Sequence, residues 1–217
     1  MSDKNRRRRT VEKVSAFVTR DGELGRELLV FRHPLAGIQV PAGTVEFGET
    51  PEQAVIRKVA EESGIKEVRI LSRLSEVIEP MPDGQKVIRQ MTKIFDSPNN
   101  DASSAGGFGL SRGNPVNVTA EAGTFSEIIC DVLDMSQDPP VSILGVKGYV
   151  RTSILASEVK RYLYHLAFLE QSAETWSIFV DGHEFQLSWT PLLPQTQLNP
   201  YQDQWLRSVY QSLVRAY

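Results

Sequence analysis

One segment of the chain constrains its fold more than any other: a glycine-containing loop that leads into a helix with strong capping signals. Thr50 has the side chain of a helix N-cap, Pro51 suits the first helical position, and Gln53 completes a capping box. Gly64 follows at the place where a left-handed C-terminal cap is expected. The sequence therefore predicts a helix that begins at Pro51 and ends before Gly64.

Charged residues are expected to cover one face of this helix. At about 100° per residue, Arg57, Lys58, Glu61 and Glu62 fall on an arc of about 140°. The carboxylates of Glu61 and Glu62 repel each other unless a cation neutralises them, and oxygen ligands of this kind suit Mg²⁺ or Mn²⁺. Arg57 is placed to pair with Glu61 four residues later. The opposite face is apolar and is predicted to face the core: Val55, Ile56, Val59 and Ala60.

Residues 43–65 resemble the Nudix box, the signature of the Nudix hydrolases. The family pattern is G-x5-E-x7-R-E-U-x-E-E-x-G-U, where U is a bulky apolar residue. The defined positions that match are Gly43, Glu49, Arg57, Val59, Glu61, Glu62, Gly64 and Ile65. One defined position departs from the pattern, because Lys58 stands where the family has glutamate.

The resemblance implies an α/β fold of the Nudix type, an α/β/α sandwich with a mixed β-sheet. It also implies Mg²⁺ or Mn²⁺, held by Glu61, Glu62 and the backbone carbonyl of Gly43 or of Ala42. Three charged side chains have catalytic roles by resemblance: Glu49, Arg57 and Glu61. The implied reaction is hydrolysis of the pyrophosphate linkage in a nucleoside diphosphate derivative or a related organic pyrophosphate.

Lys58 leaves two functions open, because an ammonium group cannot coordinate a metal and adds positive charge beside the carboxylates. The first is a hydrolase whose general base lies outside the box, with three candidates: Glu170, Glu174 and Glu184. The second is a catalytically weak or inactive Nudix-fold module that binds a nucleotide or a protein partner. Lys58 also has the spacing to pair with Glu62. Metal-dependent turnover distinguishes the two functions.

The rest of the chain predicts strands, a hairpin and a second helix. Asp181-Gly182 lies between two strand-like runs, and a helix is predicted from Tyr201 to Ala216. Residues 1–10 are expected to form a flexible basic tail, and residues 11–217 a single Nudix-like domain. An irregular insertion is predicted at about 97–157, where Ser, Asn and Gly are abundant at first and apolar periodicity is lost.

Composition limits the remaining possibilities. A net charge of −3 does not favour nucleic acid as the partner, and no apolar stretch reaches the ~20 residues that span a membrane. The single cysteine, Cys130, excludes an intrachain disulfide and fits a cytoplasmic protein. The expected partner is a small nucleotide-type substrate, which Arg32 and His33 are candidates to bind, and homodimer formation stays open.

Overall fold

The computed structural model describes residues 10–23, 25–134, 141–180, 182–194 and 196–215. The chain divides into two compact units. The first unit contains Lys13–Val77 and Arg161–Tyr217 and is called the α1 unit after its helix α1 (Pro51–Ser63). The second unit contains Ile78–Leu133 and Ser142–Lys160. The predicted basic tail lies outside the described residues except for Thr10, which begins the first strand.

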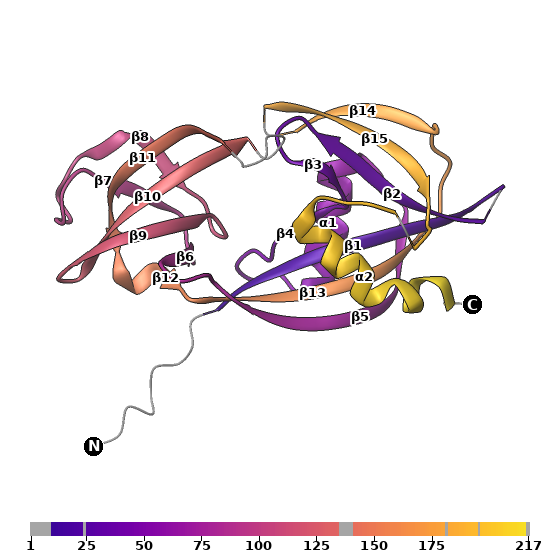
Figure 1. Ribbon diagram of the computed structural model, residues 1–217, viewed down its shortest axis with the longest axis horizontal. Coiled ribbons are helices and arrows are strands. Elements are labelled where there is room, and N and C mark those ends of the chain that lie inside the picture. Colours follow the sequence, from indigo (N-terminus) through magenta and orange to yellow (C-terminus); the bar gives the residue numbers. More distant parts are fainter. Residues whose placement is uncertain (1–9, 24, 135–140, 181, 195, 216–217) are drawn as a thin grey trace, which may run out of the picture. The chain divides into compact units, whose positions relative to one another are not determined.

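An eight-stranded sheet is the centre of the α1 unit within the described ranges (Figure 1). Its strands follow the order β14-β15-β2-β1-β13-β5, with β3 beside β2 and β4 beside β1. Figure 1 shows β1 and β13 running in the same direction and β5 in the opposite one, so the sheet is mixed. The strands are β1 (Thr10–Gly22), β2 (Gly25–His33), β3 (Gly37–Gln39), β4 (Ala42–Thr44), β5 (Val68–Pro80), β13 (Glu158–Phe168), β14 (Thr175–Val180) and β15 (His183–Pro191).

Two helices cover opposite faces of this sheet. Neighbouring residues of a strand point to opposite faces, so Leu28 packs in one layer and Leu29 in the other. Helix α1 (Pro51–Ser63) buries three apolar side chains in the layer of Leu29: Ala54, Val55 and Val59. Helix α2 (Pro200–Arg215) buries three in the layer of Leu28: Leu206, Val209 and Leu213. This is the α/β/α sandwich that the box resemblance implied.

The capping residues of α1 act as the sequence predicted. The Gln53 amide donates to Thr50 Oγ1 at 3.2 Å, and the Thr50 amide donates to Gln53 Oε1 at 2.8 Å. Gly64 ends the helix with a φ of 77°, a conformation that favours glycine. One detail of the predicted apolar face is wrong: Ile56 is 40% exposed, because the core contacts of α1 are already made by its neighbours Val55 and Val59.

The predicted hairpin and the second helix are also present. In β14 and β15, Val180 pairs with His183, and the intervening Asp181 lies outside the described residues. Helix α2 begins one residue earlier than predicted, at Pro200, and is described as far as Arg215. Alternation and helical periodicity were sufficient signals for these elements because each has one face in the core.

The second unit consists mainly of strands. Its described strands form a seven-stranded sheet in the order β12-β6-β9-β10-β11-β7-β8. They are β6 (Gln85–Ile88), β7 (Thr92–Phe95), β8 (Ser104–Leu110), β9 (Pro115–Ala122), β10 (Phe125–Asp134), β11 (Val141–Arg151) and β12 (Leu155–Ala156), with the short 3-10 helix η1 (Thr152–Ile154) before the last.

The prediction of an irregular insertion at 97–157 is therefore wrong. The segment contains β8 to β12, and Leu110 and Val116 are buried in a core of their own with Ile128 and Val150. Glycine in this segment is compatible with strands: at Gly148 in β11 it allows close packing, because a Cβ there would lie 2.5 Å from the Phe95 carbonyl oxygen.

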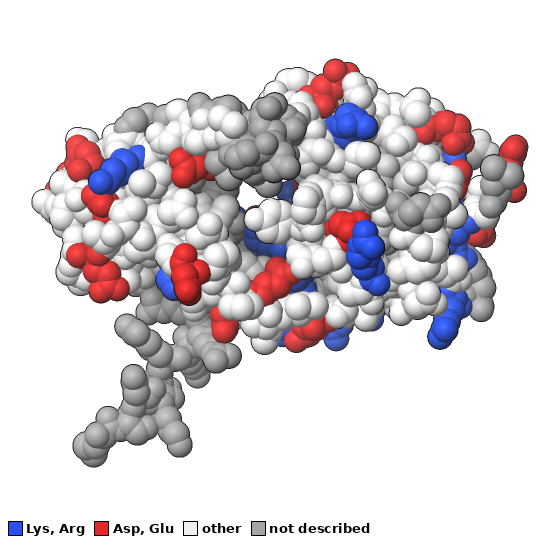
Figure 2. Space-filling model, in the orientation of Figure 1, with Lys and Arg blue, Asp and Glu red and all other residues white. Residues whose placement is uncertain are grey.

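The surface adds two observations. None of the described helices has the length and apolar character needed to cross a membrane. On the face shown in Figure 2, the basic and acidic side chains among the coloured residues are dispersed over a largely uncharged surface.

The core layer beneath α2 is expected to be sensitive to truncation. Leu163 of β13 is fully buried there, so Leu163→Ala is expected to destabilise the protein by about 2–5 kcal/mol. Denaturant unfolding followed by circular dichroism measures the loss. The matched control is Leu169→Ala, at a side chain that is 54% exposed, for which the expected loss is below about 0.5 kcal/mol. Equal losses in the two variants would contradict this packing.

Candidate functional site

Arg57 joins helix α1 to the loop that precedes it. Its Nε and Nη2 donate to the two carboxylate oxygens of Glu49, each at 2.7 Å. Nη2 also donates to the Thr44 carbonyl oxygen at 3.0 Å, and Nη1 donates to the Glu61 carboxylate at 3.1 and 3.2 Å. One guanidinium group thus fixes the end of β4, the loop and the charged face of the helix in a single arrangement.

The Glu49 carboxylate holds this loop in place through hydrogen bonds. One of its carboxylate oxygens also accepts a hydrogen bond from the Glu46 amide at 3.0 Å. The hydrogen bond from Arg57 keeps the pKa of Glu49 below its ordinary value. Both carboxylate oxygens accept hydrogen bonds from Arg57, so Glu49 holds the loop against the helix, and its catalytic role stays a prediction.

Glu61 and Glu62 lie on either side of the Lys58 ammonium group. Lys58 Nζ is 2.8 Å from Glu61 Oε2 and 3.8 Å from Glu62 Oε1. The other oxygen of Glu62 accepts a hydrogen bond from the Ala42 amide at 2.9 Å. Partial burial alone would raise the pKa of Glu61, but hydrogen bonds from Lys58 and Arg57 outweigh it and lower that pKa. The two carboxylates therefore share one cation, which is supplied by the chain itself.

Gly43 provides the space that the Lys58 side chain occupies. A Cβ at residue 43 would lie 2.2 Å from Lys58 Cε, 2.5 Å from Cδ and 2.9 Å from Cγ. Any larger residue in place of Gly43 would therefore push the lysine stem away from β4. The first glycine of the box is explained here by this close approach between strand and helix.

The carboxylates also have the chemistry to hold a divalent cation. Mg²⁺ is commonly bound by one or two carboxylates together with waters and substrate phosphates. Within the described part of the chain, no group of three or more His, Cys, Asp or Glu side chains converges as a metal cage. Glu61 and Glu62 converge on a point that a cation already occupies. The residues present thus fit one Mg²⁺ or Mn²⁺ ion, provided that the ammonium group moves aside.

The three candidate general bases make other contacts or face another way in the structure, and a role as general base stays a prediction for each. Glu170 accepts hydrogen bonds from the amides of residues 66 and 67, and Glu174 forms an ion pair with Arg20 at 2.5 Å. Glu184 alternates with Phe185 along β15, and Phe185 packs in the layer of α1. Glu184 therefore points to the face of the sheet opposite α1.

Arg32 and His33, the predicted substrate-binding pair, are not brought together. They are adjacent in β2 and point to opposite faces of the sheet. The His33 ring lies on the α1 side, with ring centroids 5.0 Å from His183 and 5.1 Å from Phe185. Burial and, to a lesser degree, the neighbouring His183 lower the pKa of His33.

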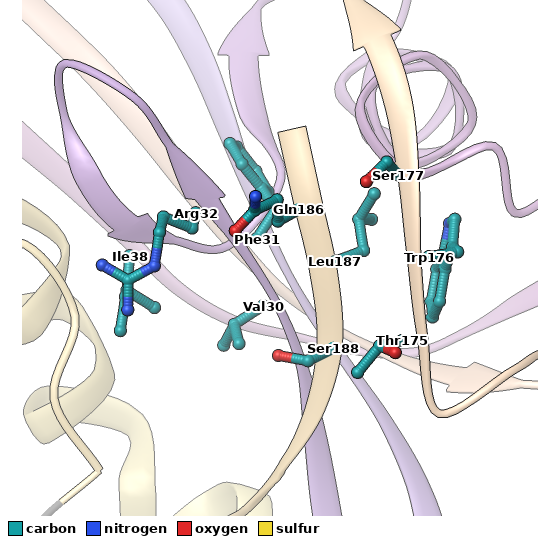
Figure 3. A pocket seen from close by; sticks show the side chains of 10 residues that line it. All are labelled: Val30, Phe31, Arg32, Ile38, Thr175, Trp176, Ser177, Gln186, Leu187 and Ser188. Atoms are coloured by element: carbon teal, nitrogen blue, oxygen red, sulfur yellow. The ribbon is translucent and has the colours of Figure 1, made fainter. Parts of the chain in front are cut away.

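Arg32 lines a separate pocket of about 390 Å³ over β2, β14 and β15. In Figure 3, Arg32 lies beside Ile38 at one end of the lining residues and Trp176 lies at the other. Polar side chains contribute to the lining: Thr175, Ser177, Gln186 and Ser188. Because the charged residues of α1 do not line this pocket, a substrate contact by Arg32 at the carboxylate site stays a prediction.

Sequence reasoning missed two side chains that support α1 from distant strands. Trp176 Nε1 donates to the Ser63 carbonyl oxygen at 2.8 Å, at the C-terminal end of the helix. The Tyr164 hydroxyl donates to Glu52 Oε1 at 2.6 Å, at the N-terminal end. Both partners are more than 100 residues away in sequence, so no local pattern signals them.

The Arg57–Glu49 pair is expected to contribute to stability in a pH-dependent way. At neutral pH, Glu49→Gln is expected to cost about 1.5 kcal/mol, because a charge-assisted bidentate contact is lost. The pKa of Glu49 is lowered in the folded state, so its contribution is fully present above the ordinary pKa of 4.5 and is lost as pH falls through the folded value.

Denaturant unfolding at several pH values measures this difference, which is expected to shrink below pH 4.5. The control is Glu76→Gln at a half-exposed pair with 3.8 Å between Arg73 and Glu76, where a change below about 0.5 kcal/mol is expected. A pH-independent difference at Glu49 would contradict the account.

The family assignment suggested by residues 43–65 can be compared with known proteins. Residues 9–102 match the family model of the NUDIX domain, so the family resemblance seen in residues 43–65 is confirmed. No curated protein matches the chain.

Three solved structures are similar to this chain to a limited degree. An Ap4A hydrolase of C. elegans in a binary complex is 12% identical, with a TM-score of 0.44, over 96% of this chain and 100% of that one. The MutT protein of Methanosarcina mazei is 14% identical, with a TM-score of 0.41, over 96% of both chains. A Nudix hydrolase of M. smegmatis, RenU, is 13% identical, with a TM-score of 0.36, over 93% of this chain and 83% of that one.

Proposed function

We propose that this chain, in which residues 9–102 match the NUDIX domain, hydrolyses the pyrophosphate linkage of a nucleoside diphosphate derivative or a related organic pyrophosphate with the help of Mg²⁺ or Mn²⁺. The observation that carries the proposal is the convergence of Glu61 and Glu62 on one cation position beside the Gly43 backbone. In this proposal Glu61, Glu62 and the carbonyl of Gly43 or Ala42 hold the metal.

The mechanism follows from what each side chain is placed to do. A divalent ion held by these residues would neutralise phosphoryl charge and would lower the pKa of an attacking water. Arg57 holds Glu61 and Glu49 in fixed positions, so the carboxylates do not need to reorganise when substrate arrives. The Ala42 amide orients Glu62 through its hydrogen bond. These contacts fix two of the proposed ligands relative to the loop.

Charge balance supports a diphosphate as the ligand. Glu49, Glu61 and Glu62 carry three negative charges, and Arg57 and Lys58 carry two positive ones, so the cluster has a net charge of −1. Addition of one divalent ion changes the net charge to +1 if Lys58 stays beside the carboxylates, and to 0 if its ammonium group leaves the cluster. In either case the metal removes the net negative charge that would repel a polyphosphate.

A second candidate function is favoured by Lys58. Because the ammonium group already neutralises the carboxylates, the fold is also suited to be a catalytically weak or inactive module that binds a nucleotide or a protein partner. The two functions differ in an observable way: the module would show no metal-dependent turnover of any pyrophosphate.

Mn²⁺ binding tests the metal assignment directly. Glu62→Gln is expected to weaken Mn²⁺ binding at least about tenfold, equivalent to ~1.4 kcal/mol, because the variant keeps an oxygen for the Ala42 amide and loses the charge. Isothermal calorimetry on the full chain measures the affinity, and Glu121→Gln in the second unit is the charge-matched control. Equal affinity in Glu62→Gln and wild type would remove Glu62 from the proposed metal site.

A further inference from the structure

We propose that Lys58 is a tethered cation that competes with the divalent ion for Glu61 and Glu62, and that it thereby sets the metal affinity of the site. The inference rests on the proposed function, because it concerns the same carboxylates. It assigns a role to the one residue at which the box departs from the family pattern.

The position of the ammonium group is the first observation behind this inference. Lys58 Nζ lies 2.8 Å from one carboxylate and 3.8 Å from the other, on the face of α1 that carries both. The Lys58 side chain is only 20% exposed, and that of Glu62 only 15%. The lysine is therefore folded into the site, whereas a lysine on a solvated helix face would normally extend into water.

The second observation is the close packing of the Lys58 side-chain carbons against Gly43. Three consecutive carbons of Lys58 lie so close to Gly43 that a single methyl group there would overlap all of them. The strand leaves room for the stem only because residue 43 is glycine. Gly43 and Lys58 thus act as a pair: the glycine positions the stem, and the stem positions the ammonium group between the carboxylates.

Competition follows from charge and space. A divalent ion bound by both Glu61 and Glu62 would need the position that the ammonium group now takes, and two cations at contact distance repel strongly in a partly buried site. The site is then competent for metal only in the fraction of molecules in which Lys58 has moved away. The apparent dissociation constant rises in inverse proportion to that fraction.

The same contacts keep the site assembled without metal. Glu61 and Glu62 would repel each other in the absence of a cation, and Lys58 removes this repulsion. The expected consequence is a site that binds divalent ions weakly. Removal of the ammonium group should uncover a stronger metal site made from the same carboxylates.

The test measures free Mn²⁺ by electron paramagnetic resonance during titration of the full-length chain. Lys58→Met removes the charge and keeps an unbranched stem, and it is expected to lower the Mn²⁺ dissociation constant at least about tenfold. Gly43→Ala displaces the stem and is expected to change the affinity in the same direction. Lys86→Met, at a lysine in β6 of the second unit, gives the same change in net charge and is expected to leave the affinity within about twofold.

An unchanged or higher dissociation constant in Lys58→Met would overturn the proposal. Circular dichroism confirms that each variant is folded, and Lys58→Gln replaces Lys58→Met if the latter is not. The Glu62→Gln variant distinguishes failure of the Lys58 proposal from failure of the proposed metal site. If Glu62→Gln weakens binding and Lys58→Met leaves it unchanged, the Lys58 proposal fails and the metal site stands. If no variant binds Mn²⁺, both fail.

Discussion

Glu62→Gln is expected to lower metal-dependent turnover of the best substrate at least about 100-fold. Glu62 is the more buried of the two carboxylates, with 15% of its side chain exposed against 43% for Glu61, and the Ala42 amide fixes its orientation. Glutamine preserves the shape and still accepts that hydrogen bond, so the loss isolates the negative charge. Steady-state kinetics at several Mn²⁺ concentrations measures the effect.

The control for this variant is Glu121→Gln, which makes the same chemical change on β9 in the second unit. Its turnover is expected to stay within about twofold of wild type. Thermal unfolding of both variants separates lost catalysis from lost folding. If Glu62→Gln retained wild-type turnover at all metal concentrations, Glu62 would have no part in the reaction.

Lys58→Glu is expected to raise metal-dependent turnover at least about tenfold, because a positioned general base contributes about 10²–10⁴-fold and even a poorly placed carboxylate should supply part of that gain. The change removes the competing ammonium group and adds a carboxylate where the Nudix pattern has one. Turnover is compared with wild type at low and at saturating Mn²⁺. A gain that vanishes at saturation assigns Lys58 to metal affinity, and a gain that persists assigns residue 58 to the chemical step.

Lys58→Met is the matched control for the added carboxylate, because it removes the ammonium group without replacing it. At saturating Mn²⁺, Lys58→Met is expected to have a turnover close to that of wild type, whereas Lys58→Glu is expected to exceed it. A fall in turnover in both variants would contradict the account. It would show that the ammonium group contributes to the reaction, for example by contacting a substrate phosphate.

The predictable parts of the fold are those whose sequence signals, such as capping residues and strand alternation, lie within the element itself. Thr50, Gln53 and Gly64 specify the ends of α1 through contacts within a few residues, and alternation along β14 and β15 reflects one buried face. The second unit carries weaker signals. Its strand β8 contains three glycines in seven residues, and the residues that form the core of the unit, such as Leu110 and Ile128, are spread over several strands.

The same distinction applies to the site. The order of charges on α1 follows from helical geometry, so the neighbourhood of Arg57, Glu61 and Glu62 was predictable. The packing of the Lys58 side chain against Gly43 was not predictable, because it depends on how closely β4 approaches the helix. Arg32 and His33 point to opposite faces because they are adjacent in strand β2. Their position shortly before the box did not show that they belong to a strand.

The central claim is metal-dependent cleavage of a pyrophosphate linkage at the carboxylates of α1. The most direct test is a screen of the full chain, with the cleaved nucleotide products separated by chromatography, over nucleoside diphosphate sugars, dinucleoside polyphosphates, ADP-ribose, NADH and nucleoside triphosphates. Each substrate is measured with Mg²⁺, with Mn²⁺ and with a chelator, in wild type and in Glu62→Gln. The account predicts turnover of at least one substrate that requires the metal and that Glu62→Gln largely abolishes. Turnover that is unaffected by the chelator or by Glu62→Gln would contradict it, and so would the absence of turnover in wild type and Lys58→Glu alike.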